Sequence, residues 1–496
     1  MINLWQKIKD AIRKGLIKIG IIKKVNDIQD LREIPNSSEM YNLIEMWKSL
    51  YKGYYAEWHD IKYHTIDGHK TRTMDTINMA KAAANEMASL VFNERCEISI
   101  GDDDNPTAEF VDDVLAKNKF NKKFQDYLEY SFAMGGMVIK PYVGNDEIKL
   151  SFVTADCFIP IAWQNDNISE AVFINESQRG KKYYTLLEWH TWDNGTYVIR
   201  NNLYESDTQN EIGYPVSLST LYPDLEEEVR IENIKKPLFV YFKPNSANNF
   251  DVQSPLGISL YANALDTMKA IDTAFDSFHR EFRLGKKRIF VPDSMIRTVY
   301  DEKGRPQRYF DSSDEVYQGY PGDMDETKIH DIKVELRVEE HVAAINALLN
   351  LFAMQTGFSS GTFTFDGESM KTATEVISEQ SKTFKSKQSH EVIIESALIE
   401  LVNVILTIAE LYGIYSTNED VEVSVAFDDS IAEDKSAEID KQIRLVQAEL
   451  QSKRRAIMEA QGVTEEEAML IIEEIIEEQK LNTPDIDDSI LFGDRE

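Results

Sequence analysis

The spacing of hydrophobic residues changes along this 496-residue chain and predicts a mixture of helices and strands in residues 1–258. Apolar residues recur every three or four positions over 78–92, which predicts a helix with one buried face. Apolar and polar residues alternate in 183–189 and 197–199, which predicts strands. Asn194-Gly195 between them is typical of a hairpin turn. We therefore expect N-terminal helices followed by an α/β domain.

A second hairpin is predicted nearer the start of the chain. Residues 61–66 and 69–71 flank Asp67-Gly68, a pair that favours the positive φ angles of a tight turn. A helix is expected before this hairpin, over residues 40–55.

Two helices with regular apolar positions follow residue 258. We expect the first at 259–283, with Ser259 as its N-cap, and the second at 338–357. Their apolar residues are Leu260, Ala264, Met268, Ile271, Phe275, Phe278 and Phe282 in the first, and Val338, Val342, Ile345, Leu349 and Phe352 in the second. This spacing is typical of packed helices. Residues 284–337 between them contain strand-like segments at 288–291, 297–300 and 308–310, so a small β-rich insert is expected there.

A loop rich in Gly, Ser, Thr and Phe comes next, and a long helix follows it. The phenylalanines of the loop are costly to expose, so we expect the loop to be docked or functional. The helix begins at the capping box Thr372 to Glu375 and has no stop before Gly413. Residues 378–391 are mostly polar, which predicts that this end is solvated, and a bend is expected before the apolar end.

The last part of the chain, 431–496, is predicted to be helical and acidic. Ile439, Ile443, Val446, Leu450 and Ile457 predict one helix that Gly462 ends. Thr464 and Glu467 form a capping box for another. The last dozen residues have no periodicity.

The chain is strongly acidic, with 54 Lys and Arg against 86 Asp and Glu and a net charge of −32. This charge argues against a protein that holds DNA by neutralising its phosphates. The two cysteines, Cys96 and Cys157, have no metal-ligand spacing, and we expect reduced thiols in an intracellular protein. We expect no membrane span, because the best apolar stretch, 401–409, lies between two glutamates.

Residues 1–24 are an exception to this acidity. They carry seven basic residues against Asp10 alone, with apolar residues at helical spacing. A basic amphipathic helix of this kind binds a membrane, nucleic acid or a partner subunit. We favour docking onto an acidic surface of a neighbouring subunit.

No motif for catalysis, cofactor binding or metal binding stands out. Neither Gly180-Lys181 nor Gly285-Lys286 has the preceding glycine of a phosphate-binding loop. His390-Glu391 lacks the second histidine of a zinc-protease helix, so we assign it to a solvated helix face. His59, His64 and His69 straddle a hairpin, and their spacing fixes no metal geometry. Asp102 to Asp104 lacks the glycine of a calcium loop and is expected to be a surface turn.

Three segments together resemble the portal (connector) proteins of tailed double-stranded-DNA bacteriophages, in the minor-capsid-type branch of phages of Gram-positive hosts. They are residues 78–94, residues 254–289 and residues 357–376. The resemblance implies an α+β portal fold. Its parts would be the N-terminal region and α/β wing (1–258), the first stem helix (259–283), the clip (284–337), the second stem helix (338–357), the tunnel loop (358–371), a long kinked wing helix with a closing strand (372–430), and a helical crown with an acidic tail (431–496).

The resemblance also implies the function. Such a protein forms a ring, usually of twelve copies, at one vertex of the capsid, after assembly in the host cytoplasm. The terminase motor would dock on the clip and move DNA through the ring, and head-completion or adaptor proteins would bind later. Major capsid and scaffold proteins would surround it. No enzyme activity, cofactor or metal is expected.

The implied site residues fall into three groups. The tunnel loop would face DNA with Phe358, Ser359, Ser360, Gly361, Thr362, Phe363, Thr364, Phe365, Asp366 and Gly367. Channel lysines would be Lys371, Lys382, Lys385 and Lys387, which could equally be solvated helix charges. The clip would begin with Lys286, Lys287 and Arg288.

Two other classes remain open on the sequence alone. A coiled-coil structural adaptor that is not a portal would account for the regular helices but not for the β-rich insert between them. A nucleic-acid-processing enzyme would need a metal-carboxylate or phosphate site, and the sequence shows none that stands out.

Overall fold

The computed structural model divides the chain into two compact units. The first holds residues 1–368 and 385–428, and the second holds residues 369–384 and 429–496. The structure describes residues 28, 38–65, 68–93, 96–101, 105–209, 211–285, 288–292, 298–300, 306–308, 317–320, 330–332, 336–365, 373–416, 422–427, 435–448, 450–461 and 463–481. The predictions for residues 1–24, for Asp102 to Asp104 and for the last dozen residues lie outside this set.

The first unit begins with helices that pack on one another. These are α3 (Ser38–Tyr51), the short α4 (Ala56–His59), α5 (Met79–Val91), α6 (Pro106–Lys117) and α7 (Phe120–Met134). α5 confirms the predicted helix at 78–92, and the side chain of Asn78 caps it by accepting a hydrogen bond from the amide of Lys81. The buried face of α5 contains small residues such as Ala80 and Ala84, so α7 can approach closely. α3 ends before the predicted residue 55, and the chain turns at Gly53, with φ 81°.

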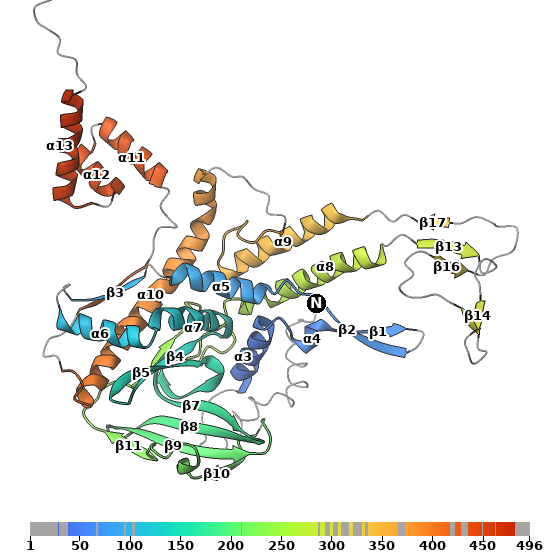
Figure 1. Ribbon diagram of the computed structural model, residues 1–496, viewed down its shortest axis with the longest axis horizontal. Helices are drawn as coiled ribbons and strands as arrows, with labels where there is room; N and C mark the ends of the chain where they lie inside the picture. The colour runs from blue at the N-terminus through green and yellow to red at the C-terminus, as the bar shows by residue number, and fades with distance from the viewer. Residues whose placement is uncertain are drawn as a thin grey trace, which may run out of the picture. The chain divides into compact units, whose positions relative to one another are not determined.

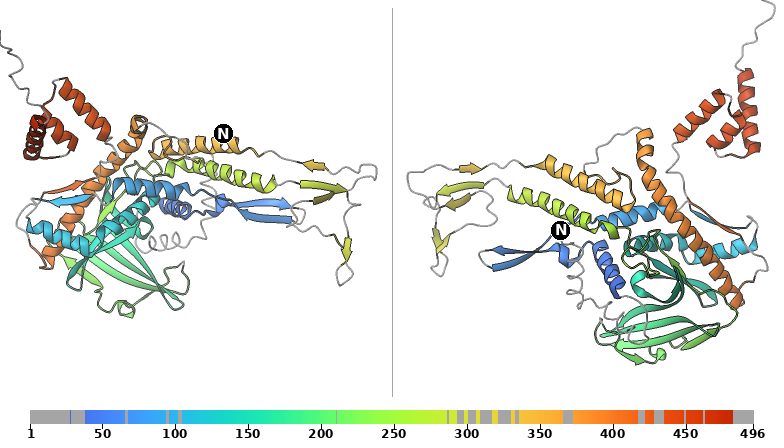
Figure 2. Two further views of the ribbon diagram at one scale, coloured as in Figure 1. Left: turned by 45° about the horizontal axis from the view of Figure 1, so that its top comes forward. Right: turned by 180° about the vertical axis from the view of Figure 1, so that it is seen from behind.

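The first predicted hairpin is present. β1 (Asp60–Thr65) and β2 (Gly68–Thr73) pair antiparallel and form a two-stranded sheet of their own. Figures 1 and 2 show this hairpin, in blue, running beside α8 in all three views.

The largest sheet has six strands and lies in the first unit. Its strand order is β10-β9-β8-β7-β6, and β11 also pairs with β9. The strands are β6 (Phe158–Gln164), β7 (Asn167–Arg179), β8 (Lys182–Asp193), β9 (Thr196–Ser206), β10 (Tyr214–Val216) and β11 (Glu228–Ile231). The predicted strands are confirmed within β8 and β9, which extend beyond the alternating segments. Asn194 and Gly195 join them with φ angles of 50° and 86°, as the predicted tight turn requires.

Two smaller sheets complete this part of the unit. β12 (Val240–Phe242), β4 (Met137–Gly144) and β5 (Glu147–Thr154) form one, in that order. β3 (Glu97–Ile100) and β18 (Val423–Ala426) form the other, although they are far apart in sequence. The hydrophobic core lies between the helices and these sheets, where the buried rings of Phe92, Phe124 and Phe242 meet edge to face.

The two helices with regular apolar positions are α8 (Leu265–Leu284) and α9 (Val338–Thr356). The second confirms its prediction, but the first begins six residues later than Ser259. The reason lies in the contacts of Ser259 and Tyr261, one local and one distant: the Ser259 hydroxyl accepts from the amide of Tyr261 at 3.3 Å. The buried Tyr261 hydroxyl in turn donates to the carbonyl of Trp47 at 2.9 Å, and a short 3₁₀ turn, Ala262–Ala264, precedes α8.

The segment between α8 and α9 is β-rich, as predicted. Its described strands are β13 (Arg288–Pro292), β14 (Thr298–Tyr300), β15 (Pro306–Arg308), β16 (Tyr317–Tyr320) and β17 (His330–Ile332). β13 lies between β16, which is parallel to it, and β17, which is antiparallel, while β14 pairs with β15.

The long predicted helix is α10 (Ala373–Leu411), 39 residues without a break at the expected bend. Its predicted polar end is not fully solvated, since Thr383, Lys387, His390 and Glu391 are all buried. Among the described helices, Lys382–Leu411 within α10 is long and apolar enough to cross a membrane by length and composition alone, and half of its most apolar window is buried. Because core helices of soluble proteins also have this composition, this is weak evidence for a span.

The second unit contains three helices near the end of the chain. They are α11 (Lys435–Gln447), α12 (Lys453–Gln461) and α13 (Glu465–Leu481). The single helix predicted from Ile439 to Ile457 was wrong, because the chain breaks between Gln447 and Lys453 and Ser452 caps α12. The predicted capping box of α13 is confirmed. The amide of Thr464 donates to the Glu467 carboxylate at 3.0 Å, and the amide of Glu467 donates to the Thr464 hydroxyl at 3.4 Å.

Candidate functional site

The α8–α9 pair lies side by side in the first unit and carries the β-rich segment at one end (Figure 1). Ile271 of α8 and Ile345 and Phe352 of α9 are fully buried. At the end next to the β-rich segment, Glu281 of α8 accepts hydrogen bonds from the backbone and guanidinium of Arg337 at 3.0–3.1 Å. His341 of α9 also lies 2.5 Å from this carboxylate. These bonds, chiefly those from Arg337, lower the pKa of Glu281 to about 2, so an ionised carboxylate clamps the helix ends together.

Two further carboxylates anchor α8 to the segment that contains the β1–β2 hairpin. The sequence places Asp272 and Asp276 on a less apolar face of the first predicted helix, but in the structure both are buried. Asp276 accepts two bonds of 2.6 Å from the Arg72 guanidinium, which lowers its pKa. Asp272 accepts from the Thr76 hydroxyl at 2.7 Å and lies 3.4 Å from the His59 ring. The bond to Asp272 raises the pKa of His59.

The loop after α9 is docked, as expected from its phenylalanines. Phe358 is fully buried, and its ring meets Phe363 edge to face at 5.0 Å. Phe365 lies against Phe278 of α8, with ring centroids 5.9 Å apart. Ser360, Gly361, Thr362 and Thr364 are exposed, whereas Ser359 is buried. Within residues 358–365, the predicted tunnel loop therefore packs its aromatic side chains against the protein and exposes most of its small residues.

Hydrogen bonds from two α9 asparagines hold the loop backbone. Asn350 accepts from the amide of Gly361, and Asn346 accepts from the amide of Phe365, each at 2.8 Å. At the start of the loop, Gly357 adopts φ 89° and ends α9. A Cβ atom at Gly357 would lie 2.4 Å from the Ser386 Oγ of α10, so this position requires glycine for two reasons. Residues 357–365 are thus held to α8, α9 and α10.

The predicted channel lysines have different environments. Lys382 and Lys385 are exposed on α10. Lys387 is instead buried and pairs with Glu391 at 2.7 Å, one helical turn away. The charge of Lys387 is therefore paired with Glu391 inside the protein and is not presented on an open surface. The structure does not describe Lys371, Asp366, Gly367, Lys286 or Lys287, and it places Arg288 at the start of β13.

The assignment of His390-Glu391 to a solvated face was wrong. His390 is 3% exposed, its Nδ1 accepts from the amide of Asn245 at 3.0 Å, and its ring lies against Phe132. Burial lowers the pKa of His390 to about 4, so the ring is neutral near pH 7. The sequence could not show this, because Asn245 and Phe132 come from distant segments.

The three histidines near the first hairpin are separated into two environments. His64 and His69 lie opposite one another across β1 and β2, with ring centroids 3.7 Å apart. His59 lies in the core beside Asp272. In the described part of the chain, no three His, Cys, Asp or Glu side chains are grouped as metal ligands.

Both cysteines are free thiols. Burial, with a smaller contribution from the neighbouring Asp156, raises the pKa of Cys157 to about 12. A thiol with this pKa remains protonated at pH 7, so Cys157 is a poor nucleophile. The two thiols therefore agree with the prediction of unpaired cysteines.

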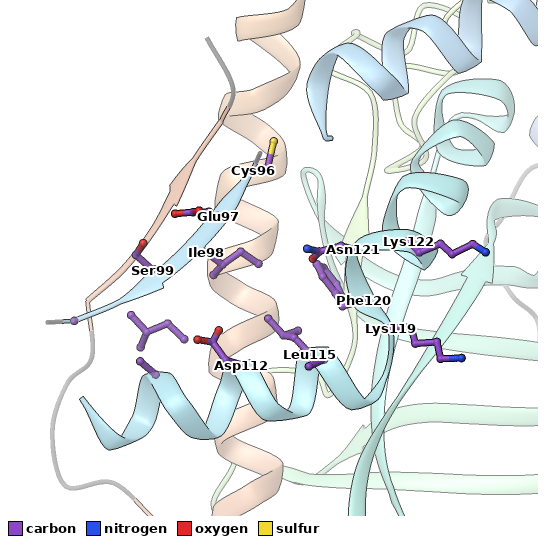
Figure 3. Close-up of a pocket in the computed structure, with 14 residues that line it drawn as sticks. Cys96, Glu97, Ile98, Ser99, Asp112, Leu115, Lys119, Phe120, Asn121 and Lys122 are labelled. Carbon is purple, nitrogen blue, oxygen red and sulfur yellow. The ribbon is translucent and has the colours of Figure 1, made fainter. Parts of the chain in front are cut away.

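A groove of about 530 Å³ lies between β3 and α6 (Figure 3). Ile98, Leu115 and Phe120 give it an apolar floor, and Asp112 lies on its rim. Burial raises the pKa of Asp112, but no second titratable group is bonded to it among the described residues. Cys96 and Ser99 also line the groove, but among the described residues neither is hydrogen-bonded to a general base, so the lining gives no support for a nucleophilic mechanism.

Several residues that hold these helices were missed from sequence. Arg72 and Glu281 have no local signal, because their partners lie far away in the chain or at the opposite end of the β-rich segment. His59 was noted, but only as part of a metal pattern with His64 and His69.

The comparison with known families decides what this architecture is. The family model for phage portal proteins of the SPP1 Gp6-like type matches residues 30–481. The chain belongs to this family of phage portal proteins. It is a structural portal, or connector, protein of a bacteriophage, and its family takes part in DNA packaging at a vertex of the capsid. No curated protein matches the chain.

Proposed function

We propose that this portal protein forms a ring of twelve copies, whose channel conducts double-stranded DNA during packaging by the terminase and during later ejection. In this proposal α8 and α9 are the stem, residues 284–337 are the clip and residues 358–371 are the tunnel loop. Residues 1–258 and 372–430 form the wing, and residues 431–496 form the crown and tail. The terminase and later the head-completion proteins bind the clip, while capsid and scaffold proteins contact the outside.

The observation that carries this proposal is the construction of the α8–α9 pair. Carboxylates fix it at its end and along its side, through Glu281 and through Asp272 and Asp276. It is therefore a stiff unit, suited to the wall of a channel. The loop that follows exposes small residues from Ser360 to Thr364 and has no described positive charge in that stretch, so it can lie close to DNA without holding its phosphates.

The net charge of −32 supports the same function. A wall of this sign releases few counterions from DNA, so a duplex can move past it.

Negative-stain electron microscopy of the purified chain tests the proposal directly. Uniform rings with a central hole are the expected result. Monomers or filaments at every protein concentration and salt condition would contradict it. ATPase and nuclease assays on the same sample are expected to give no signal, because the terminase supplies the chemistry.

A further inference from the structure

The β1–β2 hairpin has one face towards α8 and one face away from it. Opposed residues of an antiparallel pair share a face, and successive residues alternate. Arg72 and the opposed Ile61 lie on the α8 face, where Arg72 bonds Asp276. The exposed side chains on the other face are Lys62, His64, His69, Thr71 and Thr73. Tyr54, 47% exposed, joins this face because its hydroxyl donates to Asp60 at 2.9 Å. We call these residues the hairpin face.

α9 has an exposed face of complementary character. The sequence from 342 to 356 contains no Asp, Glu, Lys or Arg. Ala343, Ala347, Leu351 and Met354 are exposed along it, the last two by 39% and 55%. The first turn of the same helix exposes Glu339 and Glu340. We call these six residues the α9 face. An uncharged strip of four turns on a protein of net charge −32 is typical of a surface that another protein covers.

The two faces lie on opposite sides of α8. Figures 1 and 2 show α8 between α9 and the hairpin in all three views. The α9 face and the hairpin face also lie at similar positions along α8. Arg72 reaches α8 at Asp276, and Ile61 is opposite Arg72 in the hairpin. Lys62 is the next residue of β1 towards the hairpin tip. Glu339 and Glu340 lie between Arg337 and His341, which both bond Glu281.

A rotation about an axis parallel to α8 moves a surface sideways but leaves its height unchanged. In a ring whose stem helices run along the axis, the acidic turn of α9 in one copy therefore comes to the height of the hairpin in the next. The apolar end of the α9 face then comes towards the base of the hairpin, where Tyr54 is exposed.

We infer that the α9 face of one copy docks on the hairpin face of the next copy. Glu339 and Glu340 would meet Lys62 and the His64–His69 pair, and Leu351 would pack towards Tyr54. The contact joins two different surfaces, so it is heterologous and can close into a ring. This inference rests on the proposed function, which requires a ring but does not say which surfaces build it.

DNA is a less suitable partner for the hairpin face. Lys62 is its only lysine or arginine, and Asp60 lies on the same face, whereas phosphate binding needs clustered lysine and arginine. A second copy offers both the carboxylates and the apolar strip that this face matches.

Charge reversal on the full-length chain tests the inference. Lys62→Glu, and separately Glu340→Lys, should each raise the protein concentration at which half of the subunits are in rings by about tenfold, as measured by mass photometry. The double variant Lys62→Glu with Glu340→Lys should recover most of this loss, because every interface again holds opposite charges. Leu351→Asp tests the apolar end and should also weaken assembly by about tenfold.

Matched controls separate the interface from folding and from the proposed function. Lys181→Glu changes an exposed lysine in the β7–β8 turn and should leave ring formation unchanged. All variants should keep the wild-type melting temperature in the dissociated state within a few degrees. If wild-type rings form and all three single variants assemble normally, the inference is wrong and the portal function stands. If Lys62→Glu leaves assembly intact but weakens binding of a 20-base-pair duplex, the hairpin face contacts DNA and the inference is also wrong. If wild-type chains form no rings at all, the proposed function fails together with the inference.

Discussion

Arg72 and Asp276 are 204 positions apart in the sequence, yet they meet through two N–H···O bonds of 2.6 Å. A planar guanidinium bound to both carboxylate oxygens fixes direction as well as distance. The pair therefore sets the angle of the β1–β2 hairpin against α8. The amide of Asp75 also donates to Asp276, at 3.2 Å, which adds a backbone constraint.

Replacing Arg72 by Ala should lower the stability of the chain by about 2 kcal/mol, because Asp276 is left buried without its cation. Arg72→Lys should recover only part of this loss, since an ammonium group cannot make both parallel bonds. Thermal unfolding of the three proteins measures the difference. Arg230→Ala is the matched control, because Arg230 pairs with Glu228 on an exposed surface, where solvent screens the pair and its loss should have a much smaller effect. Equal effects of the two alanine variants would show that the Arg72 pair has no special role.

Gly357→Ala should destabilise the chain more than Gly180→Ala. Both glycines have positive φ, 89° and 63°, so both variants carry the backbone cost of about 1–2 kcal/mol that an L-residue has in the left-handed region. Only at Gly357 does the new Cβ meet another atom, the Ser386 Oγ at 2.4 Å, whereas Gly180 has open space around it. Adding Ser386→Ala to Gly357→Ala should remove part of the excess. Melting temperatures of the four proteins test this, and an equal cost at both glycines would contradict the contact.

The stability of the chain should depend on pH in opposite directions through two histidines, His390 and His59. The pKa of His390 is lowered to about 4 from an ordinary value of 6.5, so the unfolded chain binds a proton first. Stability should therefore fall as pH decreases from about 6.5 to 4, by about 3 kcal/mol at pH 4. His390→Gln should remove this pH dependence. The difference between the unfolding free energies of wild type and variant, measured by chemical denaturation at each pH, should therefore follow the titration of His390.

His59 has the opposite sign, because its bond to Asp272 raises its pKa. Its contribution is fully present below the pKa of the unfolded chain and is lost as pH rises through the higher pKa of the folded chain. The difference between wild type and His59→Gln should therefore shrink as pH increases from about 6 to 8. A profile with the same slope as that of His390 would contradict the assigned pair with Asp272.

Alanine variants of Lys387 and Lys385 should have different effects, the first on the stability of the chain and the second on DNA passage. Lys387→Ala removes the buried partner of Glu391 and should lower stability by about 2–3 kcal/mol. Lys385→Ala changes an exposed side chain and should change stability by less than about 0.5 kcal/mol. Thermal unfolding measures both effects. If Lys385 faces the channel, its variant should instead alter the amount of DNA packaged in particles that assemble normally.

Local pattern was enough to predict several of the helices and strands of this protein. Helical spacing located α5 and α9, and the Asn194-Gly195 turn located the hairpin of β8 and β9. The Thr464–Glu467 capping box was also correct, since both partners lie within one helical turn. In each of these cases the residues that stabilise the element are neighbours in sequence.

The errors arose where distant residues decide the structure. The residues before His390 are mostly polar and predict a solvated face. In the structure, Asn245 and Phe132, which come from other parts of the chain, contact this histidine and bury it. The hydroxyl of Tyr261 bonds Trp47, far back in the chain, and α8 begins only after this point. The loop from Phe358 to Phe365 was expected to be docked or functional, and it is docked, but the asparagines of α9 that hold its backbone could not be identified from spacing.

The pairing of β3 with β18 has a consequence for how the protein is made. β3 (Glu97–Ile100) is synthesised long before its partner strand β18 (Val423–Ala426). This sheet therefore cannot form until nearly all of the first unit has left the ribosome. At about 5–20 residues per second, the interval is on the order of 15–65 s. A chain that ends before β18 already contains α8 and α9 but not the completed β3–β18 sheet. Because β3 and β18 pair so late, only a subunit that has been synthesised almost to its end would be competent for ring assembly.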